Sequence, residues 1–204
     1  MKKIPTVYYG GIEFSTTTLN TPVENLLTHL KRTSKFKEDD YFKCPSFISW
    51  ASKTLVMKSP ADIEVKGSPE GYVQWFEGQY YFFADDEVNM TQYPPFMEET
   101  NVRGVVAQFD ISKWFRPINP VSALDDNGSL LLKQDQPVLY IGFDREVNLQ
   151  KVIIPKSLEN VMSTAMAHKK LKMKNRTLEK LYDNFIRARG NKVVLKQIKD
   201  YNDL

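Results

Sequence analysis

The residues of this chain best suited to chemistry are its carboxylates, which occur in adjacent pairs and as single residues beside expected strands. Two carboxylates that flank a scissile bond are the machinery of a glycosidase. The adjacent pairs fall in expected loops, where a hydrated charge is the ordinary finding. Asp62 and Asp110, in or beside expected strands, are the better candidates for catalytic residues. They define one hypothesis, a carboxylate-based enzyme acting on a polymer or nucleotide-like ligand in an aromatic groove.

The patterns of other catalytic classes are missing from the sequence. His29 and His168 lie in different expected helices without a His-x-Asp or His-Glu-x-x-His motif, so we predict neither a metal site nor a cofactor. The single cysteine, Cys44, has no hydrolase signature around it and is expected to be a small buried residue. A nucleophile elbow and a glycine-rich phosphate loop are also absent. These absences favour a protein without enzymatic activity.

The most distinctive charge pattern lies toward the C-terminus. From Gln150 onward the chain has 13 Lys/Arg and 5 Asp/Glu, a net charge of +8, whereas the preceding 149 residues have 15 and 20, a net charge of −5. Such an asymmetry suggests that the tail meets something acidic. The side chains expected to steer an acidic partner are Lys169, Lys170, Lys172, Lys174 and Arg176.

An apolar stripe follows this basic segment. Its members, at the i, i+3, i+4, i+7 and i+8 spacing of an amphipathic helix, are Leu178, Leu181, Tyr182, Phe185 and Ile186. The stripe is expected to dock on a protein partner, on a second copy or on its own domain, and the sequence leaves these open. Nucleic acid is a further alternative, because Lys and Arg neutralise phosphates. Beyond Gly190 we expect Val193–Leu195 to form a short strand or to fray.

The elements that must position these residues are short β-forming runs separated by turns. Turn residues recur every 8–12 residues, as in antiparallel sandwiches and barrels. The expected strands are residues 4–9, 55–58, 62–65, 72–76, 80–84, 102–109, 129–133, 137–143 and 147–154. We predict a mainly β fold with α additions. It comprises an antiparallel β-sandwich or jelly-roll-like domain, residues 1–155, and a basic helical extension, residues 156–204.

Four local predictions accompany this fold. Gly10-Gly11 is expected to end the first strand, and Phe76–Tyr80 to form a hairpin turn. Thr21 and Glu24 have the spacing of a capping box at the start of a helix. The aromatic residues within Tyr72–Phe83 are expected to pack in the core, and the alternative, in which half of them face outward, would suit a ligand groove.

The sequence also bears on compartment. No apolar stretch of signal-peptide length follows the basic N-terminal residues, and the longest apolar runs are far below the roughly 20 residues that span a bilayer. A single cysteine excludes an intramolecular disulfide. We therefore expect no membrane contact and a cytoplasmic location.

One ordered set of turn and strand markers covers roughly residues 40–145. The markers are Cys44-Pro45, Trp50, Ser59-Pro60-Ala61-Asp62-Ile63, Val102-x-Gly104-x-Val106, Trp114-Phe115-Arg116-Pro117 and Asp135-Gln136-Pro137-Val138-Leu139-Tyr140-Ile141. This order resembles a family of proteins of unknown function and about this length encoded by tailed bacteriophages. The resemblance implies a viral setting, in the host cytoplasm or the virion. It assigns no functional residue, and we expect a binding or assembly protein that engages a partner through its C-terminal tail.

Overall fold

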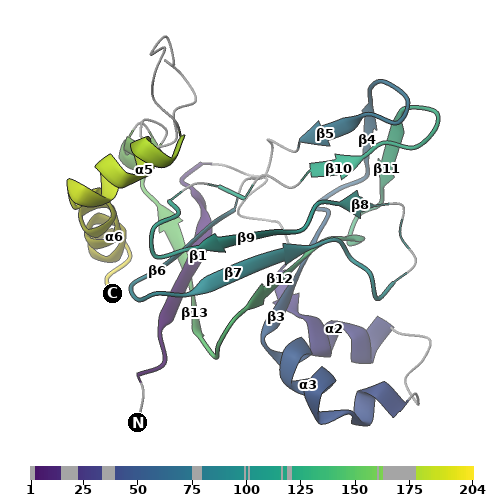
Figure 1. The fold of residues 1–204 in the computed structure, drawn as a ribbon, viewed down its shortest axis with the longest axis horizontal. Coiled ribbons are helices and arrows are strands. Elements are labelled where there is room, and N and C mark those ends of the chain that lie inside the picture. Colours follow the sequence, from purple (N-terminus) through teal and green to yellow (C-terminus); the bar gives the residue numbers. More distant parts are fainter. Residues whose placement is uncertain are drawn as a thin grey trace.

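The computed structural model describes residues 3–14, 23–33, 40–74, 80–98, 100, 102–115, 117–118, 121–159, 161–162 and 178–204. Strands predominate among these residues, and pairs of helices lie on two sides of the strands (Figure 1). All but one of the strand pairs are antiparallel. The prediction of a mainly β fold with antiparallel sheets and C-terminal helices is confirmed.

Two facing sheets form the centre of the molecule. The first has the order β13-β1-β6 and the second the order β2-β3-β12-β7-β9. The strands of the first sheet are β1 (Thr6–Ile12), β6 (Tyr81–Ala84) and β13 (Asn148–Ile154). Those of the second are β2 (Val23–Asn25), β3 (Thr54–Lys58), β7 (Asn89–Tyr93), β9 (Ala107–Asp110) and β12 (Pro137–Phe143). Both sheets contribute to one apolar core, whose buried members include Val7, Leu55, Phe82, Met90 and Ile141.

Strand β1 holds the last strand of the sandwich in place. It pairs antiparallel with β6 and parallel with β13, in register from Thr6↔Asn148 to Ile12↔Ile154. Gly10 lies inside β1, where a Cβ would stand 1.8 Å from the carbonyl oxygen of Val152. The prediction that Gly10-Gly11 ends this strand is therefore wrong. A glycine is needed at position 10 because the two backbones approach too closely for a side chain.

Helices cover the outer face of each sheet, giving a helix–sheet–sheet–helix arrangement (Figure 1). On the five-stranded sheet, α2 (Leu26–Thr33) and α3 (Pro45–Ser52) bury Leu26, Leu30 and Ala51 against Val56 and Tyr140. A 3₁₀ turn, Asp40–Lys43, precedes α3. On the three-stranded sheet lie α5 (Leu178–Arg187) and α6 (Gly190–Tyr201).

The start of α2 differs from the prediction. The helix begins at Leu26, and Glu24 belongs to strand β2, so the capping box is wrong. Asn25 caps the helix instead, because its Oδ1 accepts a hydrogen bond from the backbone N–H of Thr28 at 3.2 Å. Its Nδ2 donates to the carbonyl of Ser52 at 2.7 Å, which ties the start of α2 to the end of α3.

Two smaller sheets extend from one end of the sandwich. They pair β4 (Ile63–Lys66) with β11 (Ser129–Leu132), and β10 (Val121–Ala123) with both β5 (Tyr72–Gln74) and β8 (Arg103–Gly104). They share a second core around Val102, Leu124, Leu130 and Leu132. The turn of the predicted hairpin, residues 76–79, lies outside the described residues, but its flanking strands do not pair as predicted, because β5 pairs with β10 and β6 with β1. The expected strand 102–109 is likewise divided into β8 and β9, which belong to different sheets.

Candidate functional site

Asp62, the first candidate catalytic residue, lies in the exposed connection between β3 and β4. Its Oδ1 accepts a hydrogen bond from the backbone N–H of Gln134 at 2.8 Å, and Lys133 Nζ lies 3.5 Å from Oδ2. These two groups hold the pKa of Asp62 below its ordinary value. The carboxylate therefore connects its own loop to the loop of Lys133 and Gln134. Its lowered pKa makes it a poor proton donor.

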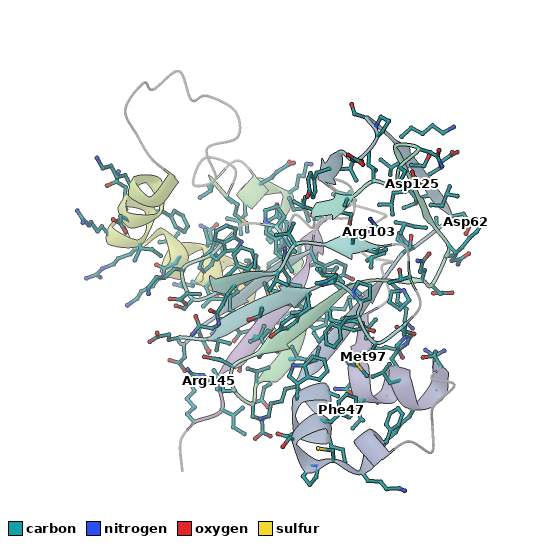
Figure 2. All side chains as sticks on the ribbon, turned by 45° about the vertical axis from the view of Figure 1, so that its right-hand side comes forward. Phe47, Asp62, Met97, Arg103, Asp125 and Arg145 are labelled. Carbon is teal, nitrogen blue, oxygen red and sulfur yellow. The ribbon has the colours of Figure 1, made fainter. Side chains whose placement is uncertain are left out.

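Asp110, the second candidate, ends strand β9 and is used within its own turn. Ser112 donates to Oδ1 from its backbone N–H at 3.1 Å and from its hydroxyl at 2.6 Å, and Lys113 binds Oδ2 at 2.6 Å. Burial opposes the charge, but these bonds hold the pKa of Asp110 below its ordinary value. Asn89 pairs with Asp110 and donates from Nδ2 to Asp144, the neighbour of Arg145. Figure 2 shows Arg145 far from Asp62. The fold does not bring the two candidates together.

The alternative outward row of aromatic side chains is not formed by β6. Its residues and Tyr80 before it are buried on both faces: Tyr80 and Phe82 point to the core between the sheets, and Tyr81 and Phe83 point to the C-terminal helices. Core packing of these residues is confirmed, and the alternative of an outward face is wrong here, because the helices cover the side that a bare sandwich would expose. Tyr72 in β5 is exposed, and residues 75–79 lie outside the described part of the chain.

Cys44 is exposed, not buried as predicted. It occupies the N-cap position of α3, directly before Pro45. The backbone amides of Phe47 and Ser46 point toward its sulfur and hold the pKa of the Cys44 thiol below its ordinary value.

An ionic cluster lies between α2 and the five-stranded sheet, and no sequence pattern indicated it. The buried ring of His29 bridges two carboxylates, with Nδ1 2.8 Å from Glu24 Oε1 and Nε2 2.8 Å from Glu98 Oε1. Lys58 of β3 also binds Glu24 Oε1, and its side chain is only 8% exposed. Arg32 reaches the same oxygen at 2.6 Å. Three cationic side chains therefore converge on one carboxylate oxygen.

Hydrogen bonds decide the charge states in this cluster. Burial opposes the charge of Glu24, but bonds from Lys58 and His29 outweigh it and lower its pKa to about 2. Burial also opposes the charge of Glu98, yet the bond from His29 holds that pKa below its ordinary value. Each ring nitrogen of His29 therefore faces a carboxylate oxygen. Tyr140 donates to Glu98 Oε2 at 3.0 Å, and burial and the Glu98 charge raise the pKa of Tyr140 well above its ordinary value.

The polar groups of this cluster bond to one another. Neither nitrogen of His29 is free to exchange a proton with a ligand, because each faces a carboxylate. The two carboxylates lie at opposite ring nitrogens, and within the described ranges no three His, Cys, Asp or Glu side chains form a group that could hold a metal ion. The arrangement fastens α2 to β3, β12 and the segment that carries Glu98, which is a structural role.

The predicted partner-binding residues fall partly outside the described chain. Lys169, Lys170, Lys172, Lys174 and Arg176 lie outside it, and Leu178, Leu181 and Tyr182 belong to α5 without described side chains. Phe185 packs on the chain's own core, with its ring 5.8 Å from that of Phe115. Ile186 beside it is half-buried. Phe185 therefore docks α5 onto its own domain.

Helix α6 is held against the three-stranded sheet by its apolar side. Val194 and Ile198 have no exposed surface and pack with Val152 and Ile154 of β13. Asn202, just after α6, accepts from the backbone N–H of Ile153 at 2.9 Å and donates to its carbonyl at 2.8 Å. This side chain thus occupies an edge of β13 as a neighbouring strand would. The predicted short strand at Val193–Leu195 is wrong, because these residues are helical.

Four exposed cations of the C-terminal helices are together called the basic face: Arg187 at the end of α5, Arg189 just before α6, and Lys192 and Lys196 on α6. All four side chains are exposed, and none has an ion-pair or hydrogen-bond partner among the residues described. Lys199 differs from them, because it lies 3.8 Å from Asp85 and 5.0 Å from the ring centre of Tyr8. Among the features described above, the basic face is the charged surface left open to a partner.

Comparison of the chain with models of known protein families and with curated protein sequences finds no match. Within the described ranges, no helix combines the length and apolar content needed to cross a bilayer.

Proposed function

We propose that this chain is a non-enzymatic binding or assembly protein that engages an acidic partner through the basic tail that ends in α5 and α6. The observation that carries the proposal is the contrast between the buried apolar residues and the exposed cations of α6. Val194 and Ile198 of α6 are fully buried against β13, whereas the cations of the basic face are exposed and unpaired within the described chain. Exposed cations without an ion pair in the described chain add no ion-pair stabilisation to it, and they are open to a partner.

The charge distribution supports the same proposal. The net charge of +8 from Gln150 onward contrasts with −5 before it, so an acidic partner would be attracted specifically to the tail. The groups with catalytic potential support the proposal as well, because Asp62, Asp110 and His29 each form hydrogen bonds within the chain. The bacteriophage origin that the sequence resemblance implies, with a location in the host cytoplasm or virion, belongs to the same proposal.

Native mass spectrometry of the tagged full chain, recovered from cells at low ionic strength, tests this function. The comparison variant combines Arg187→Gln, Arg189→Gln, Lys192→Gln and Lys196→Gln. A matched control removes four exposed charges elsewhere, with Lys31→Gln, Lys53→Gln, Lys66→Gln and Lys133→Gln. Truncation after residue 155 is unsuitable, because it would uncover the apolar face that α6 protects.

The expected result is a partner, a second copy included, that stays with the native chain and the control but leaves the basic-face variant. A native chain recovered only as a bare monomer would contradict the proposal. So would a partner retained equally by all three proteins.

A further inference from the structure

Two of the four residues of the basic face, Lys192 and Lys196, lie on α6, whose orientation against the sheet is fixed. Lys192 and Lys196 each lie two residues from Val194, about 200° around an α-helix, so they point away from the sheet that buries Val194. They stand one turn apart on the same side of α6. Arg189 directly precedes α6, and from it to Lys196 the chain extends the face over about 10 Å at 1.5 Å per residue.

The charge of this region is mainly positive, with exposed Asp183 and Asp200 one helical turn from Arg187 and Lys196. Residues 184–199 contain five Lys or Arg and no Asp or Glu, and residues 160–178 contain another five with no acidic residue. A length of about 10 Å faces about three phosphates of one strand, since duplex DNA carries a phosphate every 3.4 Å per strand. The cations therefore match a repeated anion along a line better than a single anionic group.

The composition of the basic face also selects the kind of partner. Protein interfaces are depleted in lysine, enriched in arginine and dependent on buried aromatic anchors; the four residues of this face are two arginines and two lysines, and none is aromatic. Membrane-surface helices insert an apolar face into the lipid, but the apolar face of α6 is buried against β13. Contacts to nucleic-acid phosphates need only exposed Lys and Arg side chains.

We propose that the partner is a nucleic acid, bound through its phosphate backbone by Arg187, Arg189, Lys192 and Lys196. This inference rests on the proposed function and names the class of its partner. The contacts are to phosphates, so the affinity depends on salt and not on base sequence. No aromatic side chain stands on the face to stack on unpaired bases, so a duplex is bound at least as well as a single strand.

Fluorescence anisotropy with the full chain and a labelled 20-base-pair DNA duplex tests this inference. The association constant is measured between 50 and 200 mM salt for the native chain, the fourfold basic-face variant and the fourfold control. Each lost phosphate contact reduces the slope of log K against log salt by about 0.9, so the basic-face variant is expected to lose about 3.6 from the slope. Its affinity at the lowest salt should fall at least tenfold, while the control retains the native slope. Duplex RNA and a single strand of the same length show which nucleic acid is preferred.

The outcomes separate this inference from the proposed function. Loss of a recovered protein partner by the basic-face variant, with no binding of any nucleic acid, overturns the inference and leaves the proposed function standing. No nucleic-acid binding and no recovered partner overturns both. Equal slopes for the native chain and the variant overturn the assignment to these residues. Near-ultraviolet circular dichroism checks that the variant is folded, as expected for exposed positions.

Discussion

Replacing Glu24 by glutamine is expected to destabilise the fold in a pH-dependent way. The carboxylate is the shared counter-charge of His29, Arg32 and Lys58. Glutamine keeps the shape but removes the charge, so Lys58, with a side chain only 8% exposed, loses its ion pair with this carboxylate. Removal of one partner from a buried ionic group costs more than loss of a surface pair, because the remaining charge stays poorly hydrated.

The size of the effect follows from the pKa of Glu24. A fall from 4.5 to about 2 corresponds to about 3 kcal/mol at roughly 1.36 kcal/mol per pKa unit. Because 27% of the side chain is exposed, solvent screening reduces the expected loss to about 2 kcal/mol. The folded-state pKa lies below the unfolded value, so the stabilisation is complete above about pH 4.5 and disappears as the pH falls toward 2.

Urea unfolding of the native chain and of Glu24→Gln at pH 7 and pH 3 measures this effect. At pH 3 the difference in unfolding free energy should be roughly two-fifths of its value at pH 7. Glu64→Gln is the matched control, because Glu64 makes an exposed ion pair with Lys66 at 3.0 Å and should cost less than about 0.5 kcal/mol. A loss at pH 7 no larger than that of the control, or an equal loss at both pH values, would refute the reasoning.

Three further predictions concern single residues. The Cys44 thiol, whose pKa the backbone amide of Phe47 lowers, should react with iodoacetamide with a pH midpoint below that of free cysteine, and an equal or higher midpoint would argue against this environment. Asn202→Ala should speed amide hydrogen exchange at Ile153 and cost about 1–2 kcal/mol in urea unfolding, since two backbone groups lose their partner; unchanged exchange would show that this edge is protected otherwise. Ile198→Ala should cost about 3 kcal/mol by leaving a cavity under α6, and a cost below about 1 kcal/mol would mean that the helix does not pack there.

Strand positions were largely predictable from the sequence, whereas their pairing was not. Residues 137–143 form β12 with the predicted bounds, because alternation and turn residues act locally. Pairing depends on which edges meet in space, so the adjacent β5 and β6 entered different sheets. Gly10 shows the same limit: its role is set by Val152, which is distant in sequence.

The candidate site was predictable only where its signal was local. The basic composition of the tail and its apolar stripe are visible in the sequence. Phe185, a member of that stripe, packs on the core as expected for the apolar side of a helix. The ionic cluster joins residues 24, 29, 58, 98 and 140, which no local spacing connects. The burial of Tyr81 and Phe83 also depends on helices more than 90 residues later in the chain.

Site-specific photo-crosslinking at the basic face tests the central claim most directly. A photoreactive amino acid replaces Lys196 in the full chain, and the same substitution at Lys66, on the exposed β4, serves as the control. Irradiation in the cells where the chain is naturally made should join position 196, and not position 66, to a second molecule. The proposed function predicts a heavier covalent adduct, and nuclease sensitivity of that adduct would identify the nucleic acid. No adduct at position 196, or equal adducts at both positions, would contradict the claim that this face engages a partner.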